Sequence, residues 1–324
     1  MSNPFRTAGS GPGVARWLTL LLVLLLSAAG VKAADDAIVG VLYPEVRPPY
    51  DRIFAEITQG IVAGVSSRGG RVKTYVLPAG VDPKMIASEL ERDGVRTLIV
   101  LGNRGLELIH ALPKGRRVII GAVNATPDTN GKVTAGISLS PDPKVLFKYL
   151  TRIDPKVKRV FVVYNPGKYG WLIDRARKAA RRYRLKLEAT PATNLQEAAK
   201  EYRSIVDRAG GSDAIWVLPD RSVFDTQAIL PLLLEKAWDR RFAVFSANPG
   251  QVSKGALFAL YPDNEGMGRR LAELALDTQG HGRKAGVELL RDVMTAVNTR
   301  TARRLGLRFS GGQRREFDLV FPTP

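Results

Sequence analysis

The sequence predicts an α/β protein made of two doubly wound lobes, each built on a parallel sheet and joined to the other by a hinge. Three observations support this prediction. Short apolar strands alternate with amphipathic helices along the first half of the chain, and the same alternation restarts near residue 133. After an apolar leader, about 290 residues remain, which is room for two ordinary α/β lobes rather than one.

The first series of strands and helices has continuous apolar strands, as expected where helices cover both faces of a parallel sheet. Phe54, Ile57, Ile61 and Val65 fall on one face of the helix that follows the first strand. A second helix, over residues 82–93, opens with an Asp-Pro start. The expected strands of this series are residues 37–43, 72–77, 95–101 and 117–121.

The second series repeats the pattern without repeating the sequence, so it predicts a second lobe of the same class. A helix carrying Val145, Leu146, Tyr149, Leu150 and Ile153 follows its first strand. The expected strands are residues 133–138, 160–164, 185–189, 214–218 and 242–245, and the expected helices lie around 171–183, 196–209 and 226–238.

Residues 253–276 combine an apolar strand at 256–260, a polar turn at 261–264 and an amphipathic helix. Asp263 or Asn264 can cap that helix, so the turn lies between the carboxyl end of a strand and the amino end of a helix. We expect the chain to cross between lobes here, near residues 138–142, and again near 286–290. The expected amino-terminal lobe is 34–138 plus about 263–286, and the carboxy-terminal lobe is 139–262 plus about 287–324.

The first 33 residues have the pattern of a cleaved signal peptide. Arg6 and Arg16 supply positive charge, residues 17–29 are apolar, and Val31-Lys32-Ala33 offers small residues for cleavage after Ala33. The alternative is a retained membrane anchor, but the apolar run is shorter than the roughly 20 residues that span a bilayer. We therefore expect an exported, periplasmic protein.

Cysteine is absent, which excludes disulfides, a cysteine nucleophile and a lipid-anchored cysteine. His110 and His281 are the two histidines, and neither belongs to a metal-ligand pattern. The chain has no phosphate-binding loop, no dinucleotide fingerprint after a strand and no serine nucleophile elbow. We expect no catalytic residues, no metal and no cofactor, so the chain is not predicted to be an enzyme.

The formal net charge is +18. The densest basic run, residues 175–186, surrounds an apolar stripe at helical spacing, which indicates a solvated helix face. No nucleic-acid-binding motif accompanies the charge, so nucleic acid is not an expected partner. Attraction to an anionic surface stays open.

Polar side chains follow nearly every predicted strand in both halves. Turns and helix caps alone would select Asn, Asp and Ser at any one of these positions. Their recurrence favours a binding site for a small polar solute, such as a zwitterion. The candidate ligand-binding residues are Tyr43, Tyr50, Asn103, Asn124, Asn165, Asp220, Ser222, Ser246, Tyr261 and Asp263.

Several segments, in a fixed order, resemble the ABC-transporter substrate-binding family with the type I periplasmic-binding-protein fold, which includes tryptophan- and other amino-acid-binding members. The resemblance implies a protein that captures a solute between two hinged lobes and delivers it to a membrane permease. We expect this protein to be a monomer. The matching segments are Gly136-Ile137-Ser138, Tyr164-Asn165-Pro166, Pro219-Asp220, Ala243-Val244-Phe245, residues 254–275, and Asn298 with residues 301–306.

Loops that would contact the solute differ from the family pattern. Pro219-Asp220-Arg221 stands where the family often has Pro-Asp-Ser, and Ser246-Ala247-Asn248 replaces an acidic Ser-Asp-Glu. The resemblance therefore implies the scaffold without naming the solute. An envelope sensory or interaction protein that keeps the fold without feeding a transporter remains an alternative.

Overall fold

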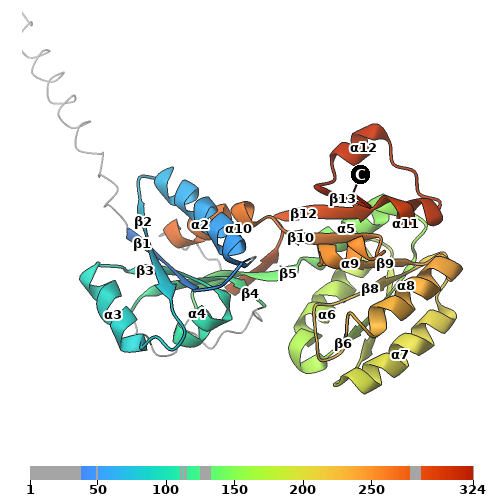
Figure 1. Cartoon of the computed structure of the whole chain (residues 1–324), viewed down its shortest axis with the longest axis horizontal. Coiled ribbons are helices and arrows are strands. Elements are labelled where there is room, and N and C mark those ends of the chain that lie inside the picture. Colours follow the sequence, from blue (N-terminus) through green and yellow to red (C-terminus); the bar gives the residue numbers. More distant parts are fainter. Residues whose placement is uncertain are drawn as a thin grey trace, which may run out of the picture. The chain divides into compact units, whose positions relative to one another are not determined.

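The computed structural model describes residues 38–48, 50–109, 112, 115–124, 133–277 and 286–323. The expected signal peptide, His110 and His281 lie outside the described residues. Within those ranges the strands form two sheets, one of six strands and one of seven, each with its own helices (Figure 1). The predicted class, two α/β lobes built on parallel-dominated sheets, is confirmed.

The first sheet is parallel throughout. Its strands are β1 (Ile38–Pro44), β2 (Arg71–Leu77), β3 (Thr97–Leu101), β4 (Arg117–Val123), β5 (Ala135–Pro141) and β11 (Gly286–Leu290). They are arranged in the order β11-β5-β4-β3-β1-β2. Its helices are α2 (Tyr50–Ser66), α3 (Pro83–Arg92), α4 (Gly102–Ile109) and α10 (Asn264–Leu276).

Both faces of the first sheet are buried because successive side chains of a strand point to opposite faces. Val41 belongs to the apolar cluster beneath α2 and α10, together with Ile57 and Leu271. The next residue, Leu42, belongs to the cluster on the other face with Leu90, which lies on α3. Figure 1 shows α2 and α10 side by side, with α3 and α4 across the sheet from them.

The second sheet contains one antiparallel pair of strands, which the prediction of parallel sheets did not include. Its strands are β6 (Arg159–Tyr164), β7 (Lys186–Pro191), β8 (Asp213–Trp216), β9 (Ala243–Ser246), β10 (Phe258–Pro262), β12 (Val293–Asn298) and β13 (Leu319–Phe321), arranged β13-β12-β10-β9-β8-β6-β7. β12 runs antiparallel to β10, while β13 is parallel to β12. β12 follows β11 after two residues, so the chain enters the second sheet beside the carboxyl end of β10 and must run backwards along it.

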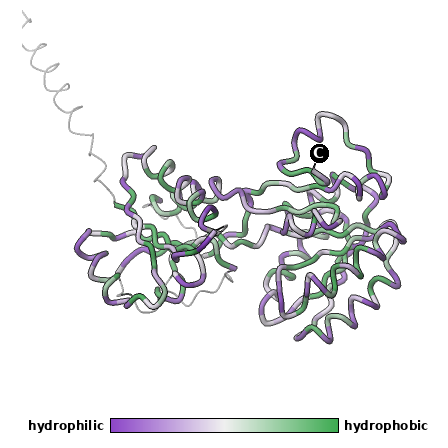
Figure 2. Tube along the Cα trace, in the orientation of Figure 1, coloured by the Kyte–Doolittle hydropathy of each residue, from purple (hydrophilic) through white to green (hydrophobic). Residues whose placement is uncertain are grey.

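Helices cover both faces of the second sheet as well. Val160 and Val162 pack with α6, whereas Phe161 and Val163 pack with α7 and α8 on the opposite face. The apolar colouring concentrates along the strands of each sheet, and hydrophilic colouring dominates the outer turns (Figure 2). The helices of this sheet are α5 (Pro143–Ile153), α6 (Pro166–Arg182), α7 (Leu195–Arg208), α8 (Ile229–Arg240), α9 (Pro249–Ser253), α11 (Thr299–Arg304) and α12 (Gly311–Arg315).

The chain passes between the sheets three times: after β5, after β10 and after β11. Hydrogen bonds link the three passages. The Asp142 amide donates to the Leu290 carbonyl at 2.8 Å, and the Asp263 amide donates to the Asp292 carbonyl at 3.0 Å. The lobe limits expected from sequence, 138 and about 286, fall within β5 and at the first residue of β11, and the limits themselves stay a prediction.

None of the helices in the described ranges is long and apolar enough to cross a membrane.

Candidate functional site

A pocket of about 260 Å³ lies at the carboxyl ends of β8 and β9. Parallel strands end at the same edge of a sheet, and the loops that follow them converge there. The lining residues that carry polar side chains are Asp220, Arg221, Thr226, Ser246, Asn248 and Gln251.

Asp220 is the centre of a hydrogen-bonded network beside this pocket. It is 5% exposed, and its Oδ1 accepts from the Ser222 hydroxyl at 2.8 Å and from the Ser222 amide at 3.0 Å. Asn165 extends the network, because its Nδ2 donates to the Ser222 hydroxyl at 3.3 Å. Three candidate residues that follow two different strands are therefore joined in one cluster.

The negative charge of Asp220 has one cation within ion-pair distance among the described residues. Lys168 Nζ, from the first turns of α6, lies 3.4 Å from Oδ1, and the lysine side chain is 57% exposed. Oδ2 is buried and has no hydrogen-bond partner among the described residues. A buried carboxylate oxygen without a donor is costly, so this position favours the approach of a donor or a cation.

Two buried tyrosines have pKa values that the charge of Asp220 helps to raise. Burial, followed by the charge of Asp220, raises the pKa of Tyr169 to about 12. The Tyr169 hydroxyl donates to the Pro219 carbonyl at 3.3 Å, which holds the loop that carries Asp220. The pKa of Tyr202 is raised further, again by burial first and Asp220 second. Both phenols are protonated at neutral pH, but the Tyr202 hydroxyl, unlike that of Tyr169, is buried without a hydrogen-bond partner among the described residues.

The loop after β9 supplies the opposite wall of the pocket. Ser246 is 2% exposed, and its hydroxyl accepts from the Asn248 amide at 3.1 Å. Asn248 caps α9 through the Gly250 amide at 2.8 Å. Gln251, in α9, is 5% exposed, and its Oε1 is buried without a partner among the described residues.

The other predicted residues of the second series, Asp263 and Tyr261, stabilise the fold around them instead of lining the pocket. Asp263 is the N-cap of α10, where its Oδ1 accepts from the Gly266 amide at 2.8 Å. Tyr261 packs against the apolar cluster of the second sheet, and burial raises its pKa. Neither residue lines the pocket that contains Asp220.

The predicted residues of the first series lie at the carboxyl edge of the first sheet. Tyr43 stacks on Phe54 with ring centroids 6.0 Å apart. Asn103 is exposed in the first turn of α4, and Asn124 is exposed directly after β4. Tyr50 is the first residue of α2. Among the described residues, no hydrogen bond joins this group to the Asp220 network.

The residues around Asp220 that were not among the candidates from sequence include Lys168, Arg221 and Gln251. Lys168 and Gln251 lie in helices, where a polar residue is ordinary and carries no signal of its own. Arg221 directly follows Asp220 and is exposed on the pocket wall. Its position was visible in the sequence as a departure from the family pattern, and that departure was the available signal.

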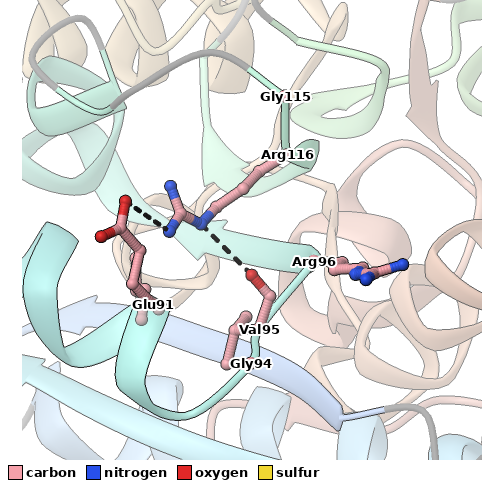
Figure 3. A pocket seen from close by; sticks show the side chains of 7 residues that line it. Glu91, Gly94, Val95, Arg96, Gly115 and Arg116 are labelled. Carbon is pink, nitrogen blue, oxygen red and sulfur yellow. Dashed lines mark hydrogen bonds and ion pairs between the residues drawn. The ribbon is translucent and has the colours of Figure 1, made fainter.

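A second pocket lies at the amino-terminal edge of the first sheet and is lined by Leu90, Glu91, Gly94, Val95, Arg96, Gly115 and Arg116. The Arg116 Nε donates to the Val95 carbonyl at 3.2 Å, and its Nη2 lies 3.8 Å from Glu91 (Figure 3). Arg96 points away from this pair. The guanidinium of Arg116 and the carboxylate of Glu91 are thus engaged with each other.

The Asp220 pocket offers a carboxylate, a guanidinium, two hydroxyls and two amides within one small volume. This set can bind a molecule with both charges by ion pairs and hydrogen bonds. Among the described residues no three His, Cys, Asp or Glu side chains are grouped so that they could hold a metal ion.

Comparison with known proteins shows the same class of fold. The ligand-free, open structure of a substrate-binding protein with adhesive properties from Clostridium difficile is similar, with a TM-score of 0.61 and 19% identity over 89% of this chain and 100% of that chain. A domain from Streptococcus pneumonia in complex with L-Trp has a TM-score of 0.52 and 18% identity over 89% of this chain and 100% of that one. Identity at this level shows the fold alone: two lobes of the type I periplasmic binding class.

The family model described as ABC transporter substrate binding protein matches residues 123–310. This match covers more than half of the chain, and it includes the strands and loops that form the Asp220 pocket. The chain therefore belongs to the ABC transporter substrate-binding protein family. No curated protein sequence matches the chain.

Proposed function

We propose that the protein is the periplasmic substrate-binding component of an ABC import system, and that it captures a small zwitterionic solute such as an amino acid or a related metabolite. Membership of the substrate-binding family supports binding of a small molecule. The delivery of that molecule to a membrane permease is the further step that the proposal adds.

One observation carries the choice of ligand class. One oxygen of the buried Asp220 carboxylate has no hydrogen-bond partner within the described ranges, and the exposed Arg221 lies beside it on the wall of the same pocket. A ligand ammonium pairs with Asp220 while a ligand carboxylate pairs with Arg221. Pairing both charges at once is what distinguishes a zwitterion from a singly charged metabolite of the same size.

Asn103 and Asn124 contribute from the other lobe in this proposal. Both are exposed at the carboxyl edge of the first sheet, where ligands of doubly wound proteins bind. Closure of the first lobe over the bound solute then adds their amide groups to the contacts that Asp220 and Arg221 make. The L-Trp held by the Streptococcus pneumonia domain makes amino acids the first compounds to test.

The test is a thermal-shift screen of the mature protein against amino acids and small polar metabolites, followed by calorimetry on the compounds that raise the melting temperature. Asp220→Asn keeps the shape of the side chain and removes its charge, so binding of the solute should weaken by about tenfold or more. Asp174→Asn is the matched control, because Asp174 lies exposed on α6 in an ion pair with Arg177.

Two results contradict the proposal. If no zwitterion raises the melting temperature, and mass spectrometry of the natively purified protein finds no bound solute, solute capture is wrong. The envelope sensory or interaction protein, which uses its basic surface rather than its pocket, then becomes the better explanation of the +18 charge. If Asp174→Asn weakens binding as much as Asp220→Asn, the assignment of the ammonium to Asp220 is wrong.

A further inference from the structure

A larger pocket than that of Asp220 lies away from it, beside α11 and α12. It has a volume of about 800 Å³ and is lined by Thr299, Arg303, Gly306, Leu307, Arg308, Phe309 and Arg314. Three of these seven residues are arginines, and none is acidic. All three arginines are exposed.

The arginines of this pocket have no acidic partner within the part of the chain that the structure describes. Residues 299–315 contain six arginines and no Asp or Glu. Among the described residues, Arg303, Arg308 and Arg314 take part in no ion pair. The nearest acids along the chain are engaged elsewhere: Glu316 lies 3.4 Å from Arg152, and Asp318 accepts from the Thr295 amide.

Three other cations near the pocket, Arg300, Arg304 and Lys156, have different roles. Arg300 and Arg304 lie over the Trp238 ring, and Arg304 Nε also donates to the Trp238 carbonyl at 3.0 Å. These two contacts hold α11 against α8. Lys156, by contrast, adds charge to the pocket, because its Nζ lies beside Gly306 in the pocket lining.

The walls that carry the three arginines are anchored. Ala302 is 1% exposed, and the Thr301 hydroxyl donates to the Gly255 carbonyl at 2.9 Å, so α11 is fixed to the sheet. Phe309 packs edge-to-face on Phe317 with centroids 5.1 Å apart, which closes the loop between α11 and α12. A fixed backbone lowers the entropy that the arginines lose when they bind a ligand together.

This pocket is at the opposite end of the second sheet from Asp220. β12 is antiparallel to β10, so Asn298 at the end of β12 lies near Phe258 at the start of β10. α11 follows Asn298 and is therefore at the amino-terminal edge of the parallel strands. The Asp220 pocket lies at their carboxyl edge, so the two sites do not share residues.

We propose that the pocket of Arg303, Arg308 and Arg314 binds a phosphate-bearing anion. Guanidinium groups bind phosphoryl oxygens through paired, parallel hydrogen bonds, and three of them suit an anion with several charges and oxygens better than a single carboxylate. The volume exceeds that of one phosphate, and Leu307 and Phe309 supply apolar wall for the group that carries it. A soluble phosphate compound and the headgroup of an anionic lipid both present this chemistry.

The test uses one site variant and one control of equal charge. Arg303→Gln/Arg308→Gln/Arg314→Gln empties the pocket of its guanidinium groups. Arg175→Gln/Arg181→Gln/Arg182→Gln removes the same charge from the exposed face of α6, outside the pocket. Pyrophosphate binding is measured by calorimetry, and binding to phosphatidylcholine vesicles with and without phosphatidylglycerol is measured by flotation, both on the mature protein.

We expect the unaltered protein to bind pyrophosphate or the phosphatidylglycerol vesicles, and the probe that binds identifies the soluble or the lipid source. The site variant should weaken that binding by about tenfold or more, and the control by about twofold or less. A third variant, Arg303→Lys/Arg308→Lys/Arg314→Lys, keeps the charge but loses the paired hydrogen bonds, so it should bind more weakly than the unaltered protein.

Three results overturn the proposal. The first is that neither probe binds. The second is that the site variant and the control weaken binding equally, which would make the attraction a property of net charge alone. The third is that the lysine variant binds as tightly as the unaltered protein, since the arginine geometry would then have no role. Circular dichroism melting of each variant shows that the losses do not come from unfolding.

Discussion

Gly60 in α2 lies directly against the backbone of Glu265 in α10, so that a methyl group on Gly60 would collide with the Glu265 carbonyl oxygen. The contact is reciprocal. Gly268 in α10 lies against the Ile57 carbonyl of α2, and Gly64 lies against Ala272. The two helices, almost two hundred residues apart in the chain, approach each other closely because glycine lines both sides of their contact.

Gly60→Ala should therefore destabilise the protein. The added methyl group forces the helices apart at a cost of about 1–3 kcal/mol, which outweighs the gain of about 1 kcal/mol that alanine brings to a helix. Gly170→Ala is the control, because Gly170 lies in α6 with no atom within 4 Å of the added group. There the free energy of unfolding should rise by about 0.5–1 kcal/mol. Urea denaturation measures both, and a Gly60→Ala protein as stable as the unaltered one would show that the helices pack less closely.

A second prediction concerns the bidentate pair at the start of β6 and β8. Arg159 donates to both carboxylate oxygens of Asp213, at 2.9 and 2.8 Å, and the Gly210 amide also donates to Asp213. Asp213 is 4% exposed. Asp213→Asn should lower the free energy of unfolding by about 1–3 kcal/mol, because the half-buried Arg159 guanidinium loses the charge of its buried partner.

The matched control for that pair is Asp174→Asn, which removes an exposed ion pair with Arg177. Its effect on the free energy of unfolding should stay within about 0.5 kcal/mol. Equal effects of the two variants, measured by the same denaturant titration, would mean that the Arg159 pair contributes no more than a surface pair.

The strand predictions depended on how strongly each strand is buried. β4, expected at 117–121, spans Arg117–Val123, and its apolar run was unambiguous because helices cover both of its faces. β2, expected at 72–77, lies at the edge of the first sheet, where Tyr75 and Leu77 are buried and their neighbours are not, so it is not the continuous apolar run expected of this series. β12 was not predicted, because its sequence mixes polar and apolar residues. Its direction comes from the pairing with β10, which no local pattern encodes.

The sequence predicted those residues of the candidate site that come directly after the ends of strands. Asn165, Asp220, Ser222 and Ser246 lie together because parallel strands end at one edge of the sheet. Their role in binding stays a prediction. Asp263, in contrast, shows that the same residue types serve as helix caps, since its side chain accepts a hydrogen bond from the Gly266 amide of α10. Sequence cannot separate the two roles, because both require a short polar side chain at the start of a helix.

A third prediction concerns Asp154, the residue that ends α5. It is 3% exposed, and burial raises the pKa of its carboxyl group. Because the pKa is higher in the folded state than in the unfolded state, the stability it contributes is fully present below the ordinary aspartate pKa and is lost as the pH rises through the folded-state value. At neutral pH the charged form is disfavoured by burial and by the carbonyl end of α5.

Asp154→Asn should consequently stabilise the protein at pH 7, and relief of the unfavourable charge at the helix end alone contributes about 0.3–1 kcal/mol. The asparagine can still accept from the Lys156 amide, which lies 3.2 Å from the aspartate oxygen. Melting temperatures of both proteins, measured from neutral to acidic pH, should converge as the aspartate becomes protonated. A constant difference at every pH would mean that the effect of the substitution does not come from the charge.

The last prediction concerns the competition for Asp220. Lys168 Nζ lies 3.4 Å from Oδ1, so its positive charge competes with an incoming ligand ammonium for the negative charge of Asp220. Lys168→Met should thus have two effects of opposite sign. Without ligand, the melting temperature should fall, because the buried carboxylate loses its partner. With ligand, the affinity for the zwitterionic solute should rise by up to about fivefold, the value of an exposed ion pair.

Lys178→Met, on the exposed face of the same helix, is the control and should change neither quantity. Calorimetry and thermal melting measure the two effects separately. A Lys168→Met protein that binds the solute more weakly would show that Lys168 contacts the ligand rather than competing with it.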